Sequence, residues 1–540
     1  MIGPLAHWPA DTSVALDERP VGRVLADHAA ATPDHPAVRW LEHGQVAALS
    51  YRGLTDGALG MAARLLARLD PGQRVAVAAT TSVDWLLLEY GAALAGTPLV
   101  PVNPALTDPE IEHILVTSEA RFLLADETYR GSPVRARLAG LVGRLGLGPV
   151  VRLGDWRELP GRSGELAPVD PAGPFLVQYT SGTTGRPKGA VLSHRAALNC
   201  AALSMARLGA TSADNWLNVM PMHHVGGSVS VALAVLAVGA TITLVPAFEP
   251  GPVLELLERT RATILGAVPT MQLALLDHPA FPSTDLSSLR LLQSGGTVVP
   301  TSLIRRAEAA FGVTVVNAYG QSESPNALMT SPDDDEVTKA ETIGTPLPQR
   351  EVRIVGPDGT TLAVGQRGEM VMRSPMVMDG YVGVDGETAA RTLTPDGWLH
   401  TGDLCSMDER GVIRIHGRLR DVIIRGGENI YPAEVEEVML GHPGVAEIAV
   451  VGVDDDHWGE VPVAVYRATP GADPAARDLQ AHARASLASF KVPRRWIRVE
   501  AFPLTASGKI KKFELRAGLG GSTRSESAPA GPSGNEAASS

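Results

Sequence analysis

Hydrophobic patterns of two kinds alternate along most of the chain. Residues 51–69 and 84–96 carry apolar side chains at helical spacing, whereas residues 74–79 and 97–102 are short apolar runs of strand length. Helices that alternate with strands predict an α/β fold with a largely parallel sheet. Residues 131–170 are rich in glycine, arginine and proline, and we expect them to be mostly loop.

The pattern changes near Arg418. A helix is expected to begin near Pro432, among short apolar strands at residues 422–425, 447–453 and 463–467. This mixture predicts a small α+β domain of about 100 residues. Glycine, serine, alanine and proline dominate the C-terminal residues, which predicts a disordered tail. The predicted division of the chain is residues 1–419, 420–517 and 518–540.

The composition fits a large enzyme. The chain has 540 residues, too many for a single hydrophobic core, and 44% of them are hydrophobic and 20% charged. The net charge of −12 argues against nucleic acid as a partner. Cys200 and Cys405 are the only cysteines, so no disulfide framework is expected.

The sequence predicts a cytoplasmic protein without integral membrane association. The N-terminal residues lack a basic region followed by an apolar one, which a secretion signal requires. Residues 225–248 form the longest uncharged run, and Gly239 divides it into a predicted buried helix and a buried strand. A membrane span is the alternative interpretation, and the serines, threonines and Pro246 within the run argue against it.

The most informative motif is Tyr-Thr-Ser-Gly-Thr-Thr-Gly-Arg-Pro-Lys-Gly at residues 179–189, which follows an apolar strand at residues 175–178. Glycines bring backbone N–H groups close to a polyanion, and hydroxyl and ammonium groups donate to phosphate oxygens. The candidate phosphate ligands are Thr180, Ser181, Gly182, Thr183, Thr184, Gly185 and Lys188. A flexible surface turn is the alternative interpretation. The spacing differs from that of the common nucleotide P-loop.

This loop resembles the phosphate loop of the adenylate-forming superfamily, which contains acyl-CoA synthetases, non-ribosomal adenylation domains and luciferases. A second motif, Asn-Ala-Tyr-Gly-Gln-Ser-Glu at residues 317–323, reads as a Tyr-Gly turn after a strand and is similar to the superfamily's Tyr-Gly-x-Thr-Glu. An aromatic face can stack on a base, and a glutamate can bind Mg²⁺. The resemblance implies that Tyr319 is the adenine platform and that Glu323 is the Mg²⁺ ligand. Ser322 replaces the usual threonine and retains its hydroxyl group.

A third motif is Trp-Leu-His-Thr-Gly-Asp-Leu at residues 398–404. An ionised aspartate after a Thr-Gly turn can accept hydrogen bonds from both ribose hydroxyls. An ordinary hairpin turn is the structural alternative. The superfamily resemblance implies that Asp403 binds ribose and that Arg418 contacts the nucleotide at the end of the large domain.

A fourth pair of motifs lies in the predicted small domain. The resemblance implies that Gly426 and Gly427 let the pantetheine arm of CoA pass, and that Lys509, in a Ser-Gly-Lys turn, is the mobile catalytic lysine. It places the hinge at Arg420, where the family usually has aspartate or lysine. His224, in Pro-Met-His-His-Val-Gly-Gly, is similar to the family's pocket histidine, whereas His223 is interpreted as an interior histidine.

The resemblance extends over roughly residues 27–516. It implies a large N-terminal domain of two stacked β-sheets with helices and a small barrel, followed by a mobile C-terminal domain. The implied catalytic residues are Lys509, His224, Glu323 and Thr180. Further ATP or AMP contacts are implied for Gly295, Gly296, Asn317, Ala318, Gly320 and Ser322. The implied acid pocket comprises Leu203, His224, Val225, Ala267, Gly296, Ala318, Gly320 and Pro325.

The implied reaction joins a carboxylic acid to a thiol in two steps. ATP and Mg²⁺ serve acyl-adenylate formation, and CoA is the expected acceptor. Residues 225–233 contain no carboxylate that could pair with an α-ammonium group, so the acid is expected to be hydrophobic (fatty, aromatic or alicyclic) and to lack an α-amine. The alternatives are an acyl-AMP ligase that loads a separate acyl carrier protein, a luciferase-like oxygenase, and a non-catalytic ATP-binding protein. The presence of Lys509 and Glu323 argues against the last of these.

Overall fold

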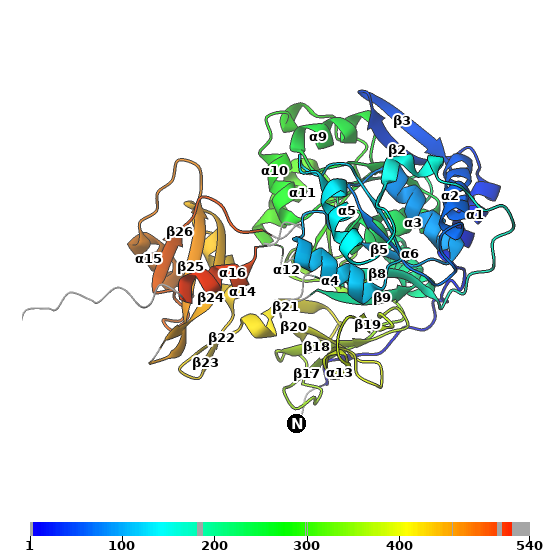
Figure 1. Ribbon diagram of the computed structural model, residues 1–540. Coiled ribbons are helices and arrows are strands. Elements are labelled where there is room, and N and C mark those ends of the chain that lie inside the picture. Colours follow the sequence, from blue (N-terminus) through cyan, green and yellow to red (C-terminus); the bar gives the residue numbers. More distant parts are fainter. Residues whose placement is uncertain are drawn as a thin grey trace, which may run out of the picture. The chain divides into compact units, whose positions relative to one another are not determined.

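The structure is a computed structural model that describes residues 4–180, 187–296, 299, 301–455, 457–504 and 510–520. One structural unit ends at Leu419 and a second begins at Arg420. The first unit contains two large mixed sheets and a smaller antiparallel sheet, and the second contains a single sheet with helices (Figure 1).

The seven-stranded sheet of the first unit includes the strands on either side of the predicted phosphate loop. Its strand order is β19-β9-β8-β5-β4-β6-β7. The strands are β4 (Val75–Ala78), β5 (Leu99–Pro101), β6 (Phe122–Ala125), β7 (Val151–Arg152), β8 (Pro174–Thr180), β9 (Lys188–Ser193) and β19 (Gly380–Val382). Strands β4 to β8 are parallel, and β9 and β19 are antiparallel to their neighbours. The helices that connect β4 to β7 along the chain are α3 (Val83–Ala95), α4 (Asp108–Ser118) and α5 (Val134–Arg144).

The nine-stranded sheet has the order β16-β15-β14-β13-β12-β10-β11-β2-β3. Its strands are β2 (Pro36–Glu42), β3 (Gln45–Ser50), β10 (Asn215–Asn218), β11 (Thr241–Leu244), β12 (Ile264–Gly266), β13 (Leu291–Gly295), β14 (Thr314–Gln321), β15 (Ser324–Met329) and β16 (Thr345–Pro346). The parallel strands are β2 and β10 to β14. Accompanying helices are α1 (Val21–Ala31), α2 (Tyr51–Leu66), α6 (His194–Arg207), α9 (Pro250–Arg259), α10 (Pro269–Leu276), α11 (Thr301–Phe311) and α12 (Glu336–Glu341). Both large sheets are thus largely parallel, as the sequence pattern predicts.

The remaining strands of the first unit form a five-stranded antiparallel sheet, β1-β17-β18-β20-β21. Its strands are β1 (His7–Trp8), β17 (Glu351–Val355), β18 (Gly368–Arg373), β20 (Leu399–Met407) and β21 (Ile413–Arg418), and α13 (Gly386–Thr392) precedes β20. The second unit contains β22 (Ile423–Arg425), β23 (Glu428–Ile430), β24 (Val445–Asp455), β25 (Gly459–Ala468) and β26 (Arg495–Arg498), with α14 (Pro432–Leu440), α15 (Ala476–Ser486) and α16 (Lys512–Gly520).

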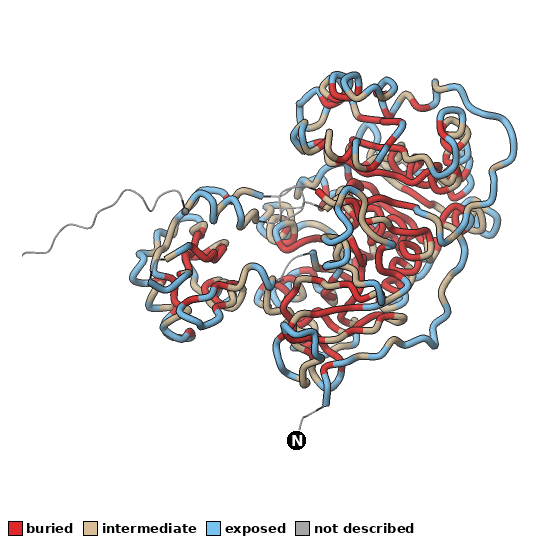
Figure 2. Tube along the Cα trace, turned by 60° about the horizontal axis from the view of Figure 1, so that its bottom comes forward, coloured by how far each residue is buried: buried red, intermediate tan, exposed pale blue. Residues whose placement is uncertain are grey.

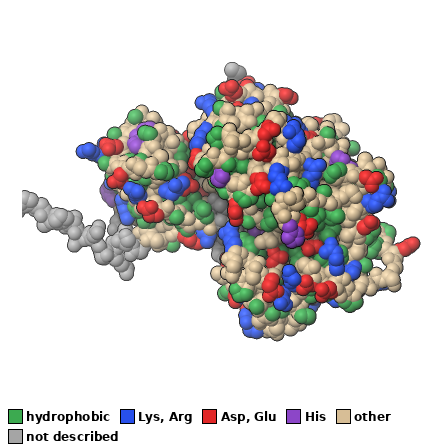
Figure 3. Space-filling view, turned by 90° about the horizontal axis from the view of Figure 1, so that it is seen from above, with side chains coloured by type: hydrophobic (Ala, Val, Ile, Leu, Met, Phe, Trp, Pro, Cys, Tyr) green, Lys and Arg blue, Asp and Glu red, His purple; other side chains and the backbone are tan. Residues whose placement is uncertain are grey.

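The main core of the first unit joins both large sheets. One hydrophobic cluster connects α2, α3 and α6 to strands of the seven- and nine-stranded sheets, and it contains Trp85, Leu198 and Ile264, all fully or almost fully buried. The tube in Figure 2 shows buried strands and helices at the centre and exposed loops around them. On the face seen in Figure 3, acidic and basic side chains are interspersed.

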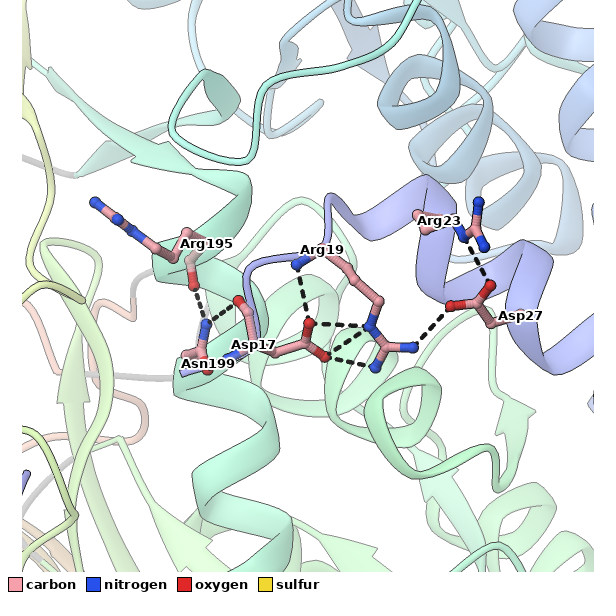
Figure 4. Close-up of polar contacts among 6 residues, drawn as sticks. All are labelled: Asp17, Arg19, Arg23, Asp27, Arg195 and Asn199. Carbon is pink, nitrogen blue, oxygen red and sulfur yellow. Dashed lines mark hydrogen bonds and ion pairs between the residues drawn. The ribbon is translucent and has the colours of Figure 1, made fainter. Parts of the chain in front are cut away.

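Helix α6 is tied to the segment that precedes α1 (Figure 4). The Asn199 side chain accepts a 2.8 Å hydrogen bond from the Asp17 backbone N–H and donates a 2.9 Å bond to the Asp17 carbonyl. Arg19 forms ion pairs with Asp17 and Asp27, at 2.6 and 2.8 Å. These contacts anchor the helix that carries Leu203, one of the predicted pocket residues.

The expectation that residues 131–170 are mostly loop is only partly confirmed. Residues 145–150 and 159–170 lie outside helices and strands, but the segment also contains α5, β7 and a 3₁₀ helix at Leu153–Glu158. In α5 the buried residues are Val134, Leu138, Leu141 and Val142. This is the one-sided spacing of an amphipathic helix, and the arginines and glycines between these residues obscured it.

The long uncharged run forms the predicted helix and strand. The helix runs through α7 (Val225–Gly227), a π-helical stretch (Ser228–Leu233) and α8 (Ala234–Val238). Gly239 ends it in the left-handed conformation, with φ +70°, and β11 follows. Within the described residues, no helix is both long and apolar enough to span a bilayer.

The predicted C-terminal tail begins inside a helix. Helix α16 continues to Gly520, so residues 518–520 are helical. The remainder of that prediction, residues 521–540, lies outside the described residues.

Candidate active site

Strands β8 and β9 hold the two ends of the predicted phosphate loop. Thr180 and Lys188 are direct partners across this antiparallel pair. A side chain at Gly189 would meet Tyr179 at 2.9 Å and Val382 at 2.6 Å, so this glycine is required for close packing. The intervening predicted ligands Ser181, Gly182, Thr183, Thr184 and Gly185 lie outside the described residues.

Glu323 lies in the turn between β14 and β15. The predicted Tyr-Gly turn is wrong, because Tyr319 and Gly320 are part of β14, with a register shift between Tyr319 and Gln321. The turn itself is formed by Ser322 and Glu323. Gly320 is needed in the strand because a Cβ there would lie 2.5 Å from a backbone nitrogen of β15.

Tyr381 of β19 connects Glu323 with Lys188. Its hydroxyl group donates a hydrogen bond to Glu323 Oε1, and its ring centroid lies 5.6 Å from Lys188 Nζ. Burial, together with the negative charge of Glu323, raises the pKa of Tyr381 above its usual range, so the hydroxyl stays a donor. The sequence motifs did not include Tyr381, because it contacts the site from a strand 58 residues away from Glu323.

Tyr319 and Asp403 meet at the predicted nucleoside site. The Tyr319 hydroxyl group donates a 2.5 Å hydrogen bond to Asp403 Oδ2, and Arg418 Nε lies 2.8 Å from Asp403 Oδ1. Burial, and then the charge of Asp403, raise the pKa of Tyr319 well above its ordinary value. Three of the residues assigned to the nucleotide are therefore in direct contact.

The residues before Asp403 form part of strand β20, so neither the predicted Thr-Gly turn nor the alternative hairpin turn is present there. Gly402 has φ +69°, which a β-bulge permits, and the β18–β20 register shifts beside it. Its N–H donates a 3.0 Å hydrogen bond to Glu369 Oε1, and the other oxygen of Glu369 lies 2.8 Å from His400 Nδ1. Glu369 thus holds the backbone that presents Asp403, and the sequence motifs did not predict it.

Asn317 and Gly295 shape the end of the nine-stranded sheet. The Asn317 amide donates a 2.9 Å hydrogen bond to the Thr342 carbonyl, so part of this side chain stabilises the fold. Gly295 pairs with Ala318, and a Cβ on Gly295 would lie 2.3 Å from the Ala318 carbonyl oxygen. Gly296, with φ +78°, follows at the exposed end of β13. Their contacts with ATP remain predictions.

The two histidines of the Pro-Met-His-His-Val-Gly-Gly motif differ in their surroundings. His223 is buried, which lowers its pKa to about 4, and its carbonyl accepts a 3.1 Å hydrogen bond from Gln178 of β8. His224 is partly exposed, and its Nδ1 accepts a 3.0 Å hydrogen bond from the Gly226 N–H. A neutral His224 ring then carries its proton on Nε2, which becomes a donor.

Apart from His224 and the two exposed glycines, Gly296 and Gly320, the predicted acid-pocket residues are apolar and buried. Leu203, Val225 and Ala318 belong to the main hydrophobic cluster, whereas Ala267 belongs to the separate cluster of α9 to α11. The helix that begins at Val225 carries buried serines but no carboxylate over residues 225–233. The described contacts therefore group three of the apolar pocket residues in one core.

Glu323 offers a suitable ligand for Mg²⁺. One oxygen accepts from Tyr381, and the other makes no hydrogen bond or ion pair within the described ranges. Among those residues, no group of three or more His, Cys, Asp or Glu side chains could hold a metal. Mg²⁺ is commonly bound by one or two carboxylates together with substrate phosphates, so a lone glutamate beside a phosphate loop fits this ion.

In the second unit, Gly426 and Gly427 form a two-residue hairpin loop between β22 and β23. Both have positive φ, +57° and +87°, as a type I′ turn requires. The Trp458 ring covers this turn, because a Cβ on Gly426 would lie 2.7 Å from it, and Arg425 lies over the same ring. The turn alone explains both glycines, so their CoA contact remains a prediction.

Two predicted positions remain, Arg420 at the boundary between the units and Lys509 in the Ser-Gly-Lys motif. Arg420 lies in a short 3₁₀ helix, Leu419–Asp421, where the second unit begins. Lys509 lies outside the described residues. The hinge and the catalytic lysine therefore remain predictions.

Comparisons with known proteins identify the family to which the chain belongs. The AMP-binding enzyme family matches residues 25–382, and its C-terminal domain matches residues 434–509. The chain is 37% identical to a feruloyl-CoA synthase of an Amycolatopsis species, over 91% of this chain and 97% of that protein. It is 36% identical to the 3-[(3aS,4S,7aS)-7a-methyl-1,5-dioxo-octahydro-1H-inden-4-yl]propanoyl:CoA ligase of Rhodococcus jostii RHA1, over 87% and 93% of the two chains.

The crystal structure of ATP-bound MatB from Rhodopseudomonas palustris is similar, with a TM-score of 0.84 and 28% identity over 92% of this chain and 99% of that one. The chain therefore belongs to the AMP-binding enzyme family. This membership confirms the predicted superfamily, the predicted fold class and the enzyme class of an AMP-forming acid–thiol ligase.

Proposed function

We propose that this protein activates a hydrophobic carboxylic acid as acyl-AMP and transfers the acyl group to CoA, with release of AMP and pyrophosphate. The observation that carries the proposal is the arrangement around the end of β14. There, Tyr319 contacts Asp403, and four residues later Glu323 contacts Tyr381 beside Lys188. The residues proposed to bind the nucleoside and those proposed to bind the phosphates thus lie next to each other, on strand β14 and in the turn that follows it.

Asp403 and Tyr319 would bind the nucleoside. An ionised aspartate accepts several hydrogen bonds, so Asp403 can receive ribose hydroxyls beside its present partner Arg418. The Tyr319 ring, held by its hydroxyl group, offers a face for adenine. Gly295 and Gly296 end the neighbouring strand without side chains that would compete for this space.

Lys188 and Glu323 would serve the triphosphate. The Lys188 ammonium group supplies a positive charge for the departing pyrophosphate, and Thr180 supplies a hydroxyl group on the partner strand. Glu323, together with phosphate oxygens, would hold Mg²⁺, which supplies positive charge to the phosphoryl group when bound.

In the first half-reaction, a carboxylate oxygen of the acid attacks the α-phosphorus of ATP, and the bond to the pyrophosphate leaving group breaks. Lys509 would stabilise the charge that grows on the phosphoryl oxygens. His224, with its proton on Nε2, would donate toward the reacting carboxylate. The product is an acyl-adenylate, a mixed anhydride.

In the second half-reaction, the thiol of CoA attacks the acyl carbon, the bond to AMP breaks, and the thiol proton is released. We assign this step to the Gly426–Gly427 turn, because a Cβ on Gly427 would have no neighbour within 4 Å and this side of the turn leaves room for the pantetheine arm. Between the two steps, Lys509 would leave the active site and the glycine turn would take its place. This requires the second unit to rotate, and Arg420 is the proposed pivot.

The acid is proposed to lack an α-amino group. The segment from Val225 to Leu233 provides no carboxylate to pair with an ammonium group, and an unpaired charge in an apolar pocket costs several kcal/mol. The two relatives named above support this class, because feruloyl and indenyl-propanoyl groups are ring-bearing acyl groups without an α-amine. Ring-bearing propanoic and propenoic acids are therefore the first acids to test, followed by fatty acids.

The proposal is tested with a panel of carboxylic acids scored by AMP release, each with and without CoA. The panel includes amino acids paired with their deaminated counterparts. We expect CoA-dependent AMP release with a hydrophobic acid and much weaker release with the matching amino acid. Acid activation without transfer to CoA, but with transfer to a holo acyl carrier protein, would favour the carrier-protein alternative. ATP binding without any acid-dependent turnover would favour a non-catalytic protein.

A further inference from the structure

Tyr381 contacts two predicted triphosphate-site residues, Lys188 of strand β9 and Glu323 of the turn between β14 and β15. Its hydroxyl group donates to Glu323 Oε1, and its ring lies against the Lys188 ammonium group, 5.6 Å from Nζ to the ring centroid. Backbone bonds fix this position: Tyr381 pairs with Ala190 in β9, and the Met378 N–H donates a 2.8 Å hydrogen bond to the Glu323 carbonyl.

Within the part of the chain that the structure describes, this arrangement leaves two opposite charges unneutralised. Among the described residues, Lys188 has no carboxylate within ion-pair distance, and Glu323 has no cationic partner. An aromatic ring attracts a cation without neutralising it, and a tyrosine hydroxyl occupies only one carboxylate oxygen. Tyr381 thus contacts both charged side chains, and without its ring the two opposite charges would attract each other directly.

We propose that Tyr381 is a positioning residue that prevents an ion pair between Lys188 and Glu323. It thereby keeps the ammonium group available to the triphosphate and one carboxylate oxygen available to Mg²⁺. This inference rests on the proposed function, because it assumes that this end of the sheet binds Mg·ATP. It adds a role for a residue that the sequence motifs did not include.

The first test measures ATP binding by calorimetry in the absence of Mg²⁺. Tyr381→Leu removes the ring, and the resulting Lys188–Glu323 pair should weaken ATP binding about fivefold, the usual upper size of a partly exposed ion pair. The double variant Tyr381→Leu/Glu323→Gln should regain most of this affinity, because a neutral glutamine cannot neutralise Lys188. Unchanged ATP binding in Tyr381→Leu, or no recovery in the double variant, overturns the proposal.

The second test uses Tyr381→Phe, which keeps the ring and loses only the hydroxyl group. ATP affinity without Mg²⁺ should stay at the wild-type value, because the ring is kept. Mg²⁺ increases ATP affinity, and the Mg²⁺ concentration needed for half of this increase should rise, because Glu323 loses the hydrogen bond that positions it. Tyr51→Phe is the matched control, because it removes a tyrosine hydroxyl that bonds to the Ala240 carbonyl at 2.8 Å, in the main core. An unchanged Mg²⁺ requirement in Tyr381→Phe contradicts the positioning of Glu323 by the hydroxyl group. Weaker ATP binding by this variant without Mg²⁺ contradicts the separating role of the ring, so Tyr381→Phe can overturn either part of the proposal if Tyr381→Leu fails to fold.

The two proposals fail in different ways. If the wild-type protein does not bind ATP, or binds it and activates no acid, the proposed function fails. A second outcome is that the wild-type protein binds ATP and activates an acid. If both Tyr381 variants then show the wild-type ATP affinity and the wild-type Mg²⁺ requirement, only the proposed role of Tyr381 fails.

Discussion

The Tyr319 hydroxyl group and the Asp403 carboxylate form a 2.5 Å hydrogen bond that joins the nine-stranded sheet to the antiparallel sheet of the first unit. Asp403 is almost fully buried and also pairs with Arg418. The aromatic side chain proposed to stack on adenine is therefore fixed by the residue proposed to bind ribose. One contact sets the geometry of both parts of the nucleoside site.

This contact predicts the effect of Tyr319→Phe. The ring that stacks on adenine is kept, while Asp403 loses a donor, so the KM for ATP should rise about tenfold, the scale of one hydrogen bond to a charged group. The KM for the acid should change little. Initial-rate kinetics with each substrate varied in turn measure the two constants. A rise in both by the same factor would show that Tyr319 stabilises the fold and not the nucleoside site.

A second prediction concerns Glu89 of α3, which is fully buried and whose oxygens have no hydrogen-bond partner in the described part of the chain. Burial raises the pKa of Glu89 to about 8, compared with 4.5 for the exposed group. The unfolded chain thus loses this proton at lower pH than the folded one does. Stability is lost as the pH rises between these values, by about 1.4 kcal/mol per pH unit.

Glu89→Gln removes this titration. Urea unfolding of both proteins between pH 5 and pH 8 measures the difference in their free energies of unfolding. We expect the wild type to lose stability relative to the glutamine variant toward pH 8. Parallel curves over this range would show that Glu89 ionises in the folded protein as it does in water.

A third prediction separates the two half-reactions at Lys509. A positioned cation on developing charge supplies roughly 2.7–4 kcal/mol, or about 10²- to 10³-fold in rate. Lys509→Ala should therefore slow acid activation at least that much, while CoA thioester formation from supplied acyl-adenylate is kept. Lys512→Ala is a nearby control, because Lys512 forms an ion pair with Glu436 at 2.6 Å in the second unit. Equal losses in both assays would contradict a role for Lys509 in the first step alone.

The sequence motifs predict contacts between residues that are close in the sequence better than contacts between strands that are far apart in it. Thr180 and Lys188 flank one loop, so their sequence spacing already indicates a shared hairpin. Tyr381 and Glu369 act through strand register and bulges, which no short motif records. The amphipathic helix α5 was missed because only four of its residues are buried, and arginines and glycines separate them in the sequence.

A fourth prediction concerns the unit boundary. Proline fixes φ near −65° and restricts the preceding residue, so Arg420→Pro should hold the second unit in one orientation. Adenylation should be largely kept and thioester formation should collapse. Pyrophosphate exchange and transfer from preformed acyl-adenylate to CoA measure the two steps separately. Loss of both at unchanged thermal stability, or of neither, would place the pivot elsewhere.

The most direct test of the central claim is acid-dependent exchange of labelled pyrophosphate into ATP by the purified wild-type protein. The site formed by Lys188, Glu323, Tyr319 and Asp403 predicts exchange that requires both Mg²⁺ and a hydrophobic carboxylic acid, and that needs no CoA. Exchange should disappear when the acid is omitted. If no acid in a broad hydrophobic panel supports exchange while ATP still binds, the account of this protein as an acid-activating enzyme is contradicted.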